Sequence, residues 1–150
     1  MPVAKLFPEA IKELFQHHPD AELAWVGDNP YAYWSLFVQL WKENKPFVIV
    51  EHDIVIGDMT IRNLEDCDSR WCAATYHEAP GEPVSGLGCT KLVPSGDVGF
   101  STFPEQVWQN VDTTVAGLLT TAGWRVHEHG PWLRHLNPRV AAQQEARNDQ

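Results

Sequence analysis

Apolar residues recur along the chain with two periods, one typical of helices and the other of strands. Helical spacing covers residues 6–18 and 103–122, and residues 31–43 are apolar on nearly every side. Short runs that favour strands stand at 22–27, 47–50, 70–77, 88–93 and 124–129. The mixed stretch at 54–69 predicts a turn and a short helix, and the Pro- and Gly-rich stretch at 79–86 predicts a loop.

The order of these elements predicts an α/β protein with a single compact, mainly parallel sheet flanked by helices. The run at 47–50 is short, apolar and rich in Val and Ile. Because a helix is predicted before it, we expect this run to be a central parallel strand that is covered on both faces. We assign residues 1–137 to one compact domain and residues 138–150 to a polar C-terminal tail.

The last long helix has recognisable signals at both predicted ends. Thr102 and Glu105 have the spacing of a capping box, and Pro104 stands in the first turn. Gly123 suits the left-handed turn that commonly closes a helix. We therefore expect this helix to cover residues 103–122.

Composition and charge exclude several classes of protein. The chain has 150 residues, of which 43% are hydrophobic and 21% charged, a balance that is typical of one globular domain. A net charge of −9 argues against a general polyanion binder, because such proteins neutralise phosphates with basic side chains. No apolar run approaches the roughly 18 to 20 residues of a membrane span, and no signal-peptide pattern is present. We expect a cytoplasmic protein without a membrane partner.

Three cysteines, Cys67, Cys72 and Cys89, cannot all pair within one molecule. Their spacings fit neither a zinc ribbon nor a Cys-x-x-Cys redox motif. We interpret them as reduced, mostly buried thiols, as a cytoplasmic setting implies.

Two acidic residues, Glu51 and Asp53, directly follow the strand predicted at 47–50. Alternate residues of an extended chain point to the same side, so the two carboxylates repel each other unless a cation lies between them. Oxygen ligands favour Mg²⁺ or Mn²⁺. Ligands of open α/β sheets bind beyond the carboxyl ends of strands, which is where these residues stand. The sequence predicts a metal site here, with a solvated acidic turn as the alternative.

A third acid, Asp112, stands at the edge of the apolar stripe of its predicted helix. An acid at the boundary between core and solvent suits proton abstraction, with a solvent-facing helix residue as the alternative. Gly86 and Gly88 stand at the end of the predicted loop. They either let the backbone approach a ligand or simply end the loop, and their spacing is not that of a P-loop.

Histidines offer a different metal chemistry. His127 and His129 stand on one side of their predicted strand, and His135 follows shortly after. Three imidazoles could hold zinc or iron, as in a metal hydrolase. The alternative is a set of surface histidines without a ligand.

The sequential order of these motifs resembles the family 2-like inverting glycosyltransferases of GT-A type. In that family an apolar strand ends in an acidic motif, a Gly-containing strand follows, and a helix then carries the catalytic acid. That helix ends at a glycine that is followed by a strand, and a later His often completes the metal site. Over residues 22–137 the matching segments are Phe47-Val48-Ile49-Val50-Glu51-His52-Asp53, Gly86-Leu87-Gly88-Cys89-Thr90-Lys91, Trp108-Gln109-Asn110-Val111-Asp112, Ala122-Gly123-Trp124-Arg125-Val126 and Leu133-Arg134-His135-Leu136-Asn137. Three short motifs also resemble those of small glycosyltransferase-like proteins of phages and actinobacteria. They are Val50-Glu51-His52-Asp53-Ile54, Trp71-Cys72 and Leu87-Gly88-Cys89-Thr90-Lys91.

The resemblance implies a metal-dependent transfer of sugar from a nucleotide-sugar donor to an acceptor hydroxyl. Asp53 and His135 would hold Mn²⁺ or Mg²⁺, with Glu51 helping directly or through water, and Asp112 would be the catalytic base. The residues implied in donor or acceptor binding are Gly86, Gly88, Thr90, Trp108 and Trp132. The sugar, the nucleotide and the type of acceptor stay open.

The chain also departs from the family pattern. The first carboxylate is Glu51 rather than Asp, and Asp112 lacks the Glu that usually precedes it. Only about fifty residues come before the acidic motif, fewer than the family normally uses to bind the nucleoside. Three possibilities follow: a reduced donor site, the need for a partner subunit, of which a homodimer is one form, or lost activity. The alternative functions are a non-catalytic α/β binding module and the His-rich hydrolase.

Overall fold

The computed structural model describes residues 8–26, 29–79, 82–84 and 86–136. The helices are α1 (Pro8–His17), α2 (Ala32–Lys42), α3 (Thr60–Glu65), the short 3-10 helix η1 (Phe100–Thr102) and α4 (Trp108–Thr121). The strands are β1 (Phe47–Val50), β2 (Ile54–Val55), β3 (Trp71–Ala79), β4 (Glu82–Val84), β5 (Cys89–Leu92) and β6 (His127–His135). The predicted tail at 138–150 lies outside the described residues.

The sheet is mixed, and this corrects the prediction of a mainly parallel one. Its strand order is β1-β5-β3-β6-β2, with β4 paired to β3, and only the β3–β6 pair is parallel among the described pairs. Parallel neighbours need a long crossover, usually a helix, whereas antiparallel neighbours need only a short turn. The stretch from β3 through β5 contains no described helix, so its strands pair antiparallel.

The strand β1 lies at one end of the strand order, although its apolar run predicted a central parallel strand. It pairs antiparallel with β5, and all four of its residues are half-buried. An unbroken apolar run shows that both faces of a strand are covered by other elements. It does not show how many neighbours the strand has, and that is where the prediction was wrong.

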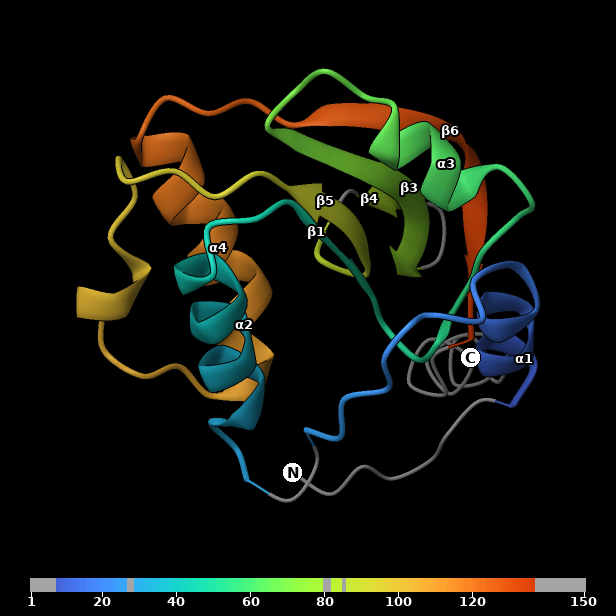
Figure 1. The fold of residues 1–150 in the computed structure, drawn as a ribbon, viewed down its shortest axis with the longest axis horizontal. Coiled ribbons are helices and arrows are strands. Elements are labelled where there is room, and N and C mark those ends of the chain that lie inside the picture. The colour runs from blue at the N-terminus through green and yellow to red at the C-terminus, as the bar shows by residue number, and fades with distance from the viewer. Residues whose placement is uncertain (1–7, 27–28, 80–81, 85, 137–150) are drawn as a thin grey trace, which may run out of the picture.

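Both faces of the sheet are covered because its strands alternate their side chains. On β1, Phe47 and Ile49 pack on one side, whereas Val48 and Val50 pack on the other. Figure 1 shows α2 and α4 side by side against one face and α3 near the other. The α2–α4 cluster comprises Trp34, Phe37, Trp41, Trp71, Leu87, Leu92, Val98, Phe100, Val111, Val115, Leu119 and Trp124. The α3 cluster comprises Ile54, Ile56, Ile61, Leu64, Cys72, Ala74, Tyr76, Cys89 and Leu133.

The helix α4 begins at Trp108, five residues later than predicted. The hydroxyl of Thr102 donates to the carbonyl of Gly99 at 3.0 Å within η1, so it does not cap α4. The buried ring of Phe100 holds η1 in the core, which turns the chain before the long helix can begin. The other end is as predicted, because Gly123 adopts a φ of +88° there.

Two further predictions about strands were wrong. Residues 22–26 of the strand predicted at 22–27 form no strand, and Leu23 and Trp25 are exposed. A strand needs a neighbour to satisfy its backbone, and this segment has no ladder partner among the described residues. The last strand, predicted at 124–129, instead covers His127 to His135. No helix in the described part of the chain combines the length and hydropathy needed to cross a bilayer.

Candidate functional site

A cavity of about 570 Å³ lies beside the carboxyl end of β1. Its walls come from α1, the extended segment 21–26, α2, the first turns of α4 and the end of β6. The volume is typical of a small-molecule site. The polar side chains that line it are Glu22, Tyr33, Glu51, His52, Asp53, Tyr76, Trp108, Gln109, Asp112 and His135. Four residues that the sequence singled out, Glu51, Asp53, Asp112 and His135, therefore share one cavity.

Asp53 and His135 form a close polar pair in the cavity. The Nε2 atom of His135 lies 2.9 Å from Oδ2 of Asp53, and both side chains are largely buried. The backbone reinforces the pair, because the N–H of Leu136 donates to the carbonyl of Asp53 at 2.7 Å. Burial by itself would raise the pKa of Asp53, but the hydrogen bond and charge of His135, with the charge of His52, lower it overall.

Glu51 lines the same cavity without joining a compact set of three ligands. Its backbone N–H donates to the carbonyl of Gly88 at 2.8 Å, which continues the β1–β5 ladder by one residue. Among the described residues, the group of three potential ligands within 4.8 Å of one another is Cys67, Cys72 and His129, not Glu51, Asp53 and His135. Asp53 and His135 are thus the close pair, and Glu51 lies further out.

Asp112 is held at the cavity wall by a backbone contact. Its Oδ1 atom accepts a hydrogen bond from the N–H of Leu87 at 3.2 Å. The preceding residue Val111 is buried in the α2–α4 cluster, and the N–H of Trp108 donates to the carbonyl of Pro30 at 2.9 Å. These contacts fix where the first turns of α4, and hence the carboxylate, lie.

The predicted ligand-binding glycines shape the wall rather than line the cavity. A Cβ at Gly86 would lie 2.3 Å from Oδ2 of Asp112, and one at Gly88 would lie 2.6 Å from the ring of Tyr76. The hydroxyl of Tyr76 accepts a hydrogen bond from the N–H of Gly88 at 3.1 Å. Thr90 is buried and donates to the carbonyl of Gly86. These residues hold the catalytic candidate in place.

The two predicted tryptophans differ in position. Trp108 lines the cavity at the start of α4. Trp132, in contrast, is 56% exposed on β6 and does not line the cavity.

Tyr33 is a site residue that sequence reasoning missed. Its hydroxyl is buried in the cavity wall and has no hydrogen-bond partner among the described residues. Burial, followed by the charges of Glu51 and Asp112, raises its pKa well above the usual value. A buried hydroxyl without a partner is costly, so this atom indicates a polar group supplied by a ligand or water. No local pattern signals this role, because α2 carries another hydroxyl at Ser35, which is exposed.

The three histidines do not come together. His135 is bonded to Asp53, whereas His127 and His129 lie side by side with ring centroids 4.7 Å apart. They form no group of three ligands within 4.8 Å. The prediction of a three-His centre is therefore wrong, because β6 is long enough to place its two ends in different surroundings.

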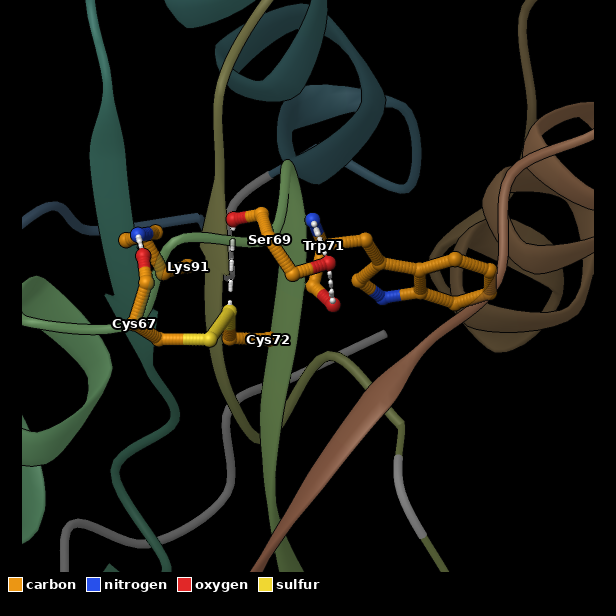
Figure 2. Close-up of a disulfide and its surroundings, with 5 residues drawn as sticks. All are labelled: Cys67, Ser69, Trp71, Cys72 and Lys91. Atoms are coloured by element: carbon orange, nitrogen blue, oxygen red, sulfur yellow. Dashed lines mark hydrogen bonds between the residues drawn. A yellow bond between two sulfur atoms is a disulfide. The ribbon is translucent and has the colours of Figure 1, made fainter.

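The cysteines also differ from the prediction. Cys67 and Cys72 form a disulfide, while Cys89 is a free, buried thiol. Burial raises the pKa of Cys89 to about 12. The prediction of three reduced thiols is wrong for the first two, because the turn after α3 returns Cys67 to the side of β3 that carries Cys72 (Figure 2).

Comparisons with protein-family models, with curated proteins and with solved structures gave no significant match. The resemblance to the family 2-like glycosyltransferases therefore stays a prediction.

Proposed function

We propose that this chain is a metal-dependent glycosyltransferase that moves a sugar from a nucleotide-sugar donor to an acceptor hydroxyl with inversion. The observation that supports it best is the meeting of Asp53, His135 and Asp112, which are far apart in sequence, in one cavity of about 570 Å³. Because the sheet is mixed, the proposal depends on this site and not on the fold.

Asp53 and His135 are the ligands for the proposed cation, with Glu51 acting through water. One carboxylate and one imidazole suit Mn²⁺ or Mg²⁺ that completes its shell with water and phosphate oxygens. A cation bound there would neutralise the negative charge of the leaving diphosphate. Without a cation, the hydrogen bond and charge of His135 lower the pKa of Asp53, so its carboxylate is ionised. To bind the cation, His135 would have to act as the neutral imidazole.

Asp112 is the proposed base. Its carboxylate accepts the proton of the acceptor hydroxyl while the acceptor oxygen bonds to the anomeric carbon. The bond from that carbon to the diphosphate oxygen breaks at the same time, and the nucleoside diphosphate leaves with the bonding electrons. The hydrogen bond from Leu87 to Oδ1 orients the carboxylate for this transfer.

Tyr33 would bind the substrate through a hydroxyl group. Its own hydroxyl lies in the cavity wall within the electrostatic reach of Glu51, Asp53 and Asp112. A sugar hydroxyl there would satisfy the buried Tyr33 oxygen, and this preference for hydroxyl-rich ligands agrees with a sugar donor.

Calorimetry tests the proposal directly. Purified full-length protein is titrated with uridine and guanosine diphosphates, each with and without Mn²⁺. We expect saturable binding of at least one nucleotide only when Mn²⁺ is present. Transfer is then assayed with the matching nucleotide-sugars. Absence of binding by every nucleotide tried would overturn the proposal.

Three variants separate the roles of the site residues. Asp53→Asn should abolish Mn²⁺-dependent nucleotide binding, because it removes the charged metal ligand. Asp112→Asn should preserve binding and reduce transfer by about 10² to 10⁴-fold, the usual contribution of a general base. Asp66→Asn, at an exposed acid after α3, is the matched control and should change neither. Equal activity of all three variants would contradict the assignment.

A non-catalytic binding module is the second candidate, and the apolar part of the cavity favours it. Leu14, Phe15, Leu36 and Leu40 line one part of the wall, and such side chains suit an apolar ligand. This candidate predicts a thermal melting temperature that responds to neither Mn²⁺ nor nucleotides.

We also keep two further expectations in the proposal, a cytoplasmic setting and a homodimer. Oxidising compartments favour disulfides, so the Cys67–Cys72 bond argues against the first. Native mass spectrometry of the purified protein would show whether it is a dimer. Fractionation of the source cells would test the cytoplasmic setting.

A further inference from the structure

We propose that Cys67, Cys72 and His129 form a redox-gated site for a thiophilic divalent cation, with zinc as the best fit. The disulfide is the closed form of this site, and reduction opens it. The site lies outside the cavity, because none of the three residues lines it. The proposal is independent of the glycosyltransferase function.

The first support is the position of the ligand atoms. One ring nitrogen of His129 lies within 4.8 Å of both cysteine sulfurs. Two ligands of one zinc ion lie about 3.5 to 3.8 Å apart, given bonds of about 2.0 Å to nitrogen and 2.3 Å to sulfur. After reduction, the two sulfur atoms would have to move apart from their bonded distance. The ring nitrogen of His129 would have to move only about 1 Å closer to them.

The second support comes from His129 itself. Its Nε2 atom is buried and has no hydrogen-bond partner among the described residues. The hydroxyl of Thr75 donates to the carbonyl of His129 at 3.2 Å, so the backbone that carries the ring is held in place. The imidazole of His129 thus has a buried, unpartnered nitrogen and lies next to two sulfurs, and a bound cation would complete such an environment.

The strand pairing places a fourth candidate ligand nearby. In the parallel β3–β6 pair, Cys72 is opposite His127 and Ala74 is opposite His129. Their side chains therefore share one face, and the rings of His127 and His129 lie 4.7 Å apart. A rotation of the exposed His127 side chain would complete a Cys₂His₂ set, with water as the other possible fourth ligand.

A buried lysine beside the disulfide favours thiolates after reduction. The ammonium of Lys91 donates to the carbonyl of Cys67 (Figure 2). No carboxylate partner is found for Lys91 among the described residues. A buried cation that lacks an anion is costly, and a nearby cation stabilises thiolate over thiol. Figure 2 also shows the indole of Trp71 pointing away, which leaves this side of β3 to the sulfur atoms.

The gating step balances with a dithiol as reductant. The dithiol gives two electrons and two protons, so that it becomes a disulfide while Cys67 and Cys72 become thiols. Binding of Zn²⁺ then releases both protons and forms two Zn–S bonds. A peroxide reverses the sequence: it takes two electrons from the two thiolates and two protons from solvent, and its O–O bond breaks to give an alcohol and water. The two sulfurs re-form the S–S bond and the Zn²⁺ is released.

Cobalt absorption tests the site in the full-length protein. The chain is reduced with a phosphine, the phosphine is removed without oxygen, and Co²⁺ is added. We expect thiolate-to-cobalt charge-transfer bands at one equivalent, displaced by one equivalent of Zn²⁺. The oxidised protein should give no such bands. The Asp53→Asn background confirms that the cavity does not contribute, since its ligands contain no sulfur.

Variants identify the ligands. Cys67→Ser and Cys72→Ser should each remove the expected two-sulfur spectrum, and His129→Ala should weaken binding about tenfold or more. Cys89→Ala is the matched control, because this buried thiol lies outside the group and should leave the bands unchanged. His18→Ala is the corresponding histidine control.

Each result decides the proposal. A reduced chain that keeps its circular dichroism but gives no charge-transfer bands overturns it, and so does unchanged affinity in His129→Ala. If reduction unfolds the chain, refolding on addition of Zn²⁺ supports the proposal. Failure of Zn²⁺ to refold the reduced chain overturns it.

Discussion

Gly86 shows how a single residue without a side chain fixes the position of a candidate catalytic group. Its backbone lies so close to Asp112 that an added Cβ would be 2.3 Å from Oδ2 and 2.7 Å from the hydroxyl of Tyr76. The same segment supplies the N–H of Leu87 to Asp112. The glycine therefore acts through close approach to a side chain and not through direct contact with a ligand.

Replacing Gly86 with alanine should displace the Asp112 carboxylate. We expect transfer to fall about 10²-fold, because a shift of about 1 Å at a catalytic group has that effect. The free energy of unfolding should fall by about 1 to 3 kcal/mol from overpacking. Gly96→Ala is the control, since nothing lies within 4 Å of its Cβ position. Assays of transfer and urea unfolding measure both effects, and wild-type activity in Gly86→Ala would contradict this geometry.

The Asp53–His135 pair should make stability depend on pH. The pKa of Asp53 is lowered on folding, so its carboxylate stabilises the fold above the unfolded pKa of about 3.9. That contribution is lost as the pH falls through the lower, folded pKa. At pH 6 without divalent cations, Asp53→Asn should reduce the free energy of unfolding by about 1 to 3 kcal/mol. Urea unfolding at a series of pH values should show this difference shrinking below pH 4; a constant difference would refute the pairing.

At the residue scale, the sequence indicated candidate site residues where a charged side chain stands at the end or the edge of an apolar element. Asp53 and Asp112 were recognisable because one follows an apolar strand and the other borders an apolar stripe. Tyr33 was not, because its importance comes from burial without a partner. Burial of an individual hydroxyl depends on elements that are distant in sequence, so no local pattern reports it.

At the scale of elements, helix α4 was predictable in its body and at its C-terminal end. The buried positions Val111, Val115 and Leu119 recur at helical spacing, and Gly123 adopts the left-handed turn. The N-terminal end was not predictable from the capping pattern, because the hydroxyl of Thr102 bonds within η1 instead. Thr102 could either cap α4 or belong to η1, and the burial of Phe100 in the core favours η1.

Two glycines of this region should respond oppositely to alanine. Gly117 lies exposed within α4 with no atom within 4 Å of its Cβ position, so Gly117→Ala should stabilise the protein by about 0.5 to 1 kcal/mol. Gly123 also has open space around it, but its φ is +88°. Gly123→Ala should therefore destabilise by about 1 to 2 kcal/mol. Thermal melts of both variants measure the contrast, and stabilisation by both would exclude the strain at Gly123.

At the scale of the whole molecule, aromatic packing between α2 and its neighbours joins the helical layer to the sheet. Phe37 is fully buried, and its ring contacts those of Trp34, Trp41, Phe47 and Phe100. These partners come from α2 itself, from β1 and from η1. One side chain thus connects three elements that are separated in the sequence.

Removing this ring should destabilise the whole fold. Phe37→Ala should lower the free energy of unfolding by about 3 to 5 kcal/mol, because burial is lost and a cavity remains. Phe37→Leu should lie between this variant and the wild type. Ser35→Ala, at an exposed position of the same helix, should change the free energy by no more than about 0.5 kcal/mol. Chemical unfolding compares the three, and a small effect of Phe37→Ala would show that this cluster does not stabilise the fold.

The sequence by itself determined where the main helices and β1 lie, and which charged groups stand at the ends of their elements, because periodicity and terminal residues act over a few neighbouring positions. The tertiary structure decided the mixed strand order, the positions of β4 and η1, and the contact between Asp53 and His135 across 82 residues. It also decided the Cys67–Cys72 bond and its proximity to His129. These features depend on which distant segments bury one another's surfaces, and that choice is made by the packing of the whole chain.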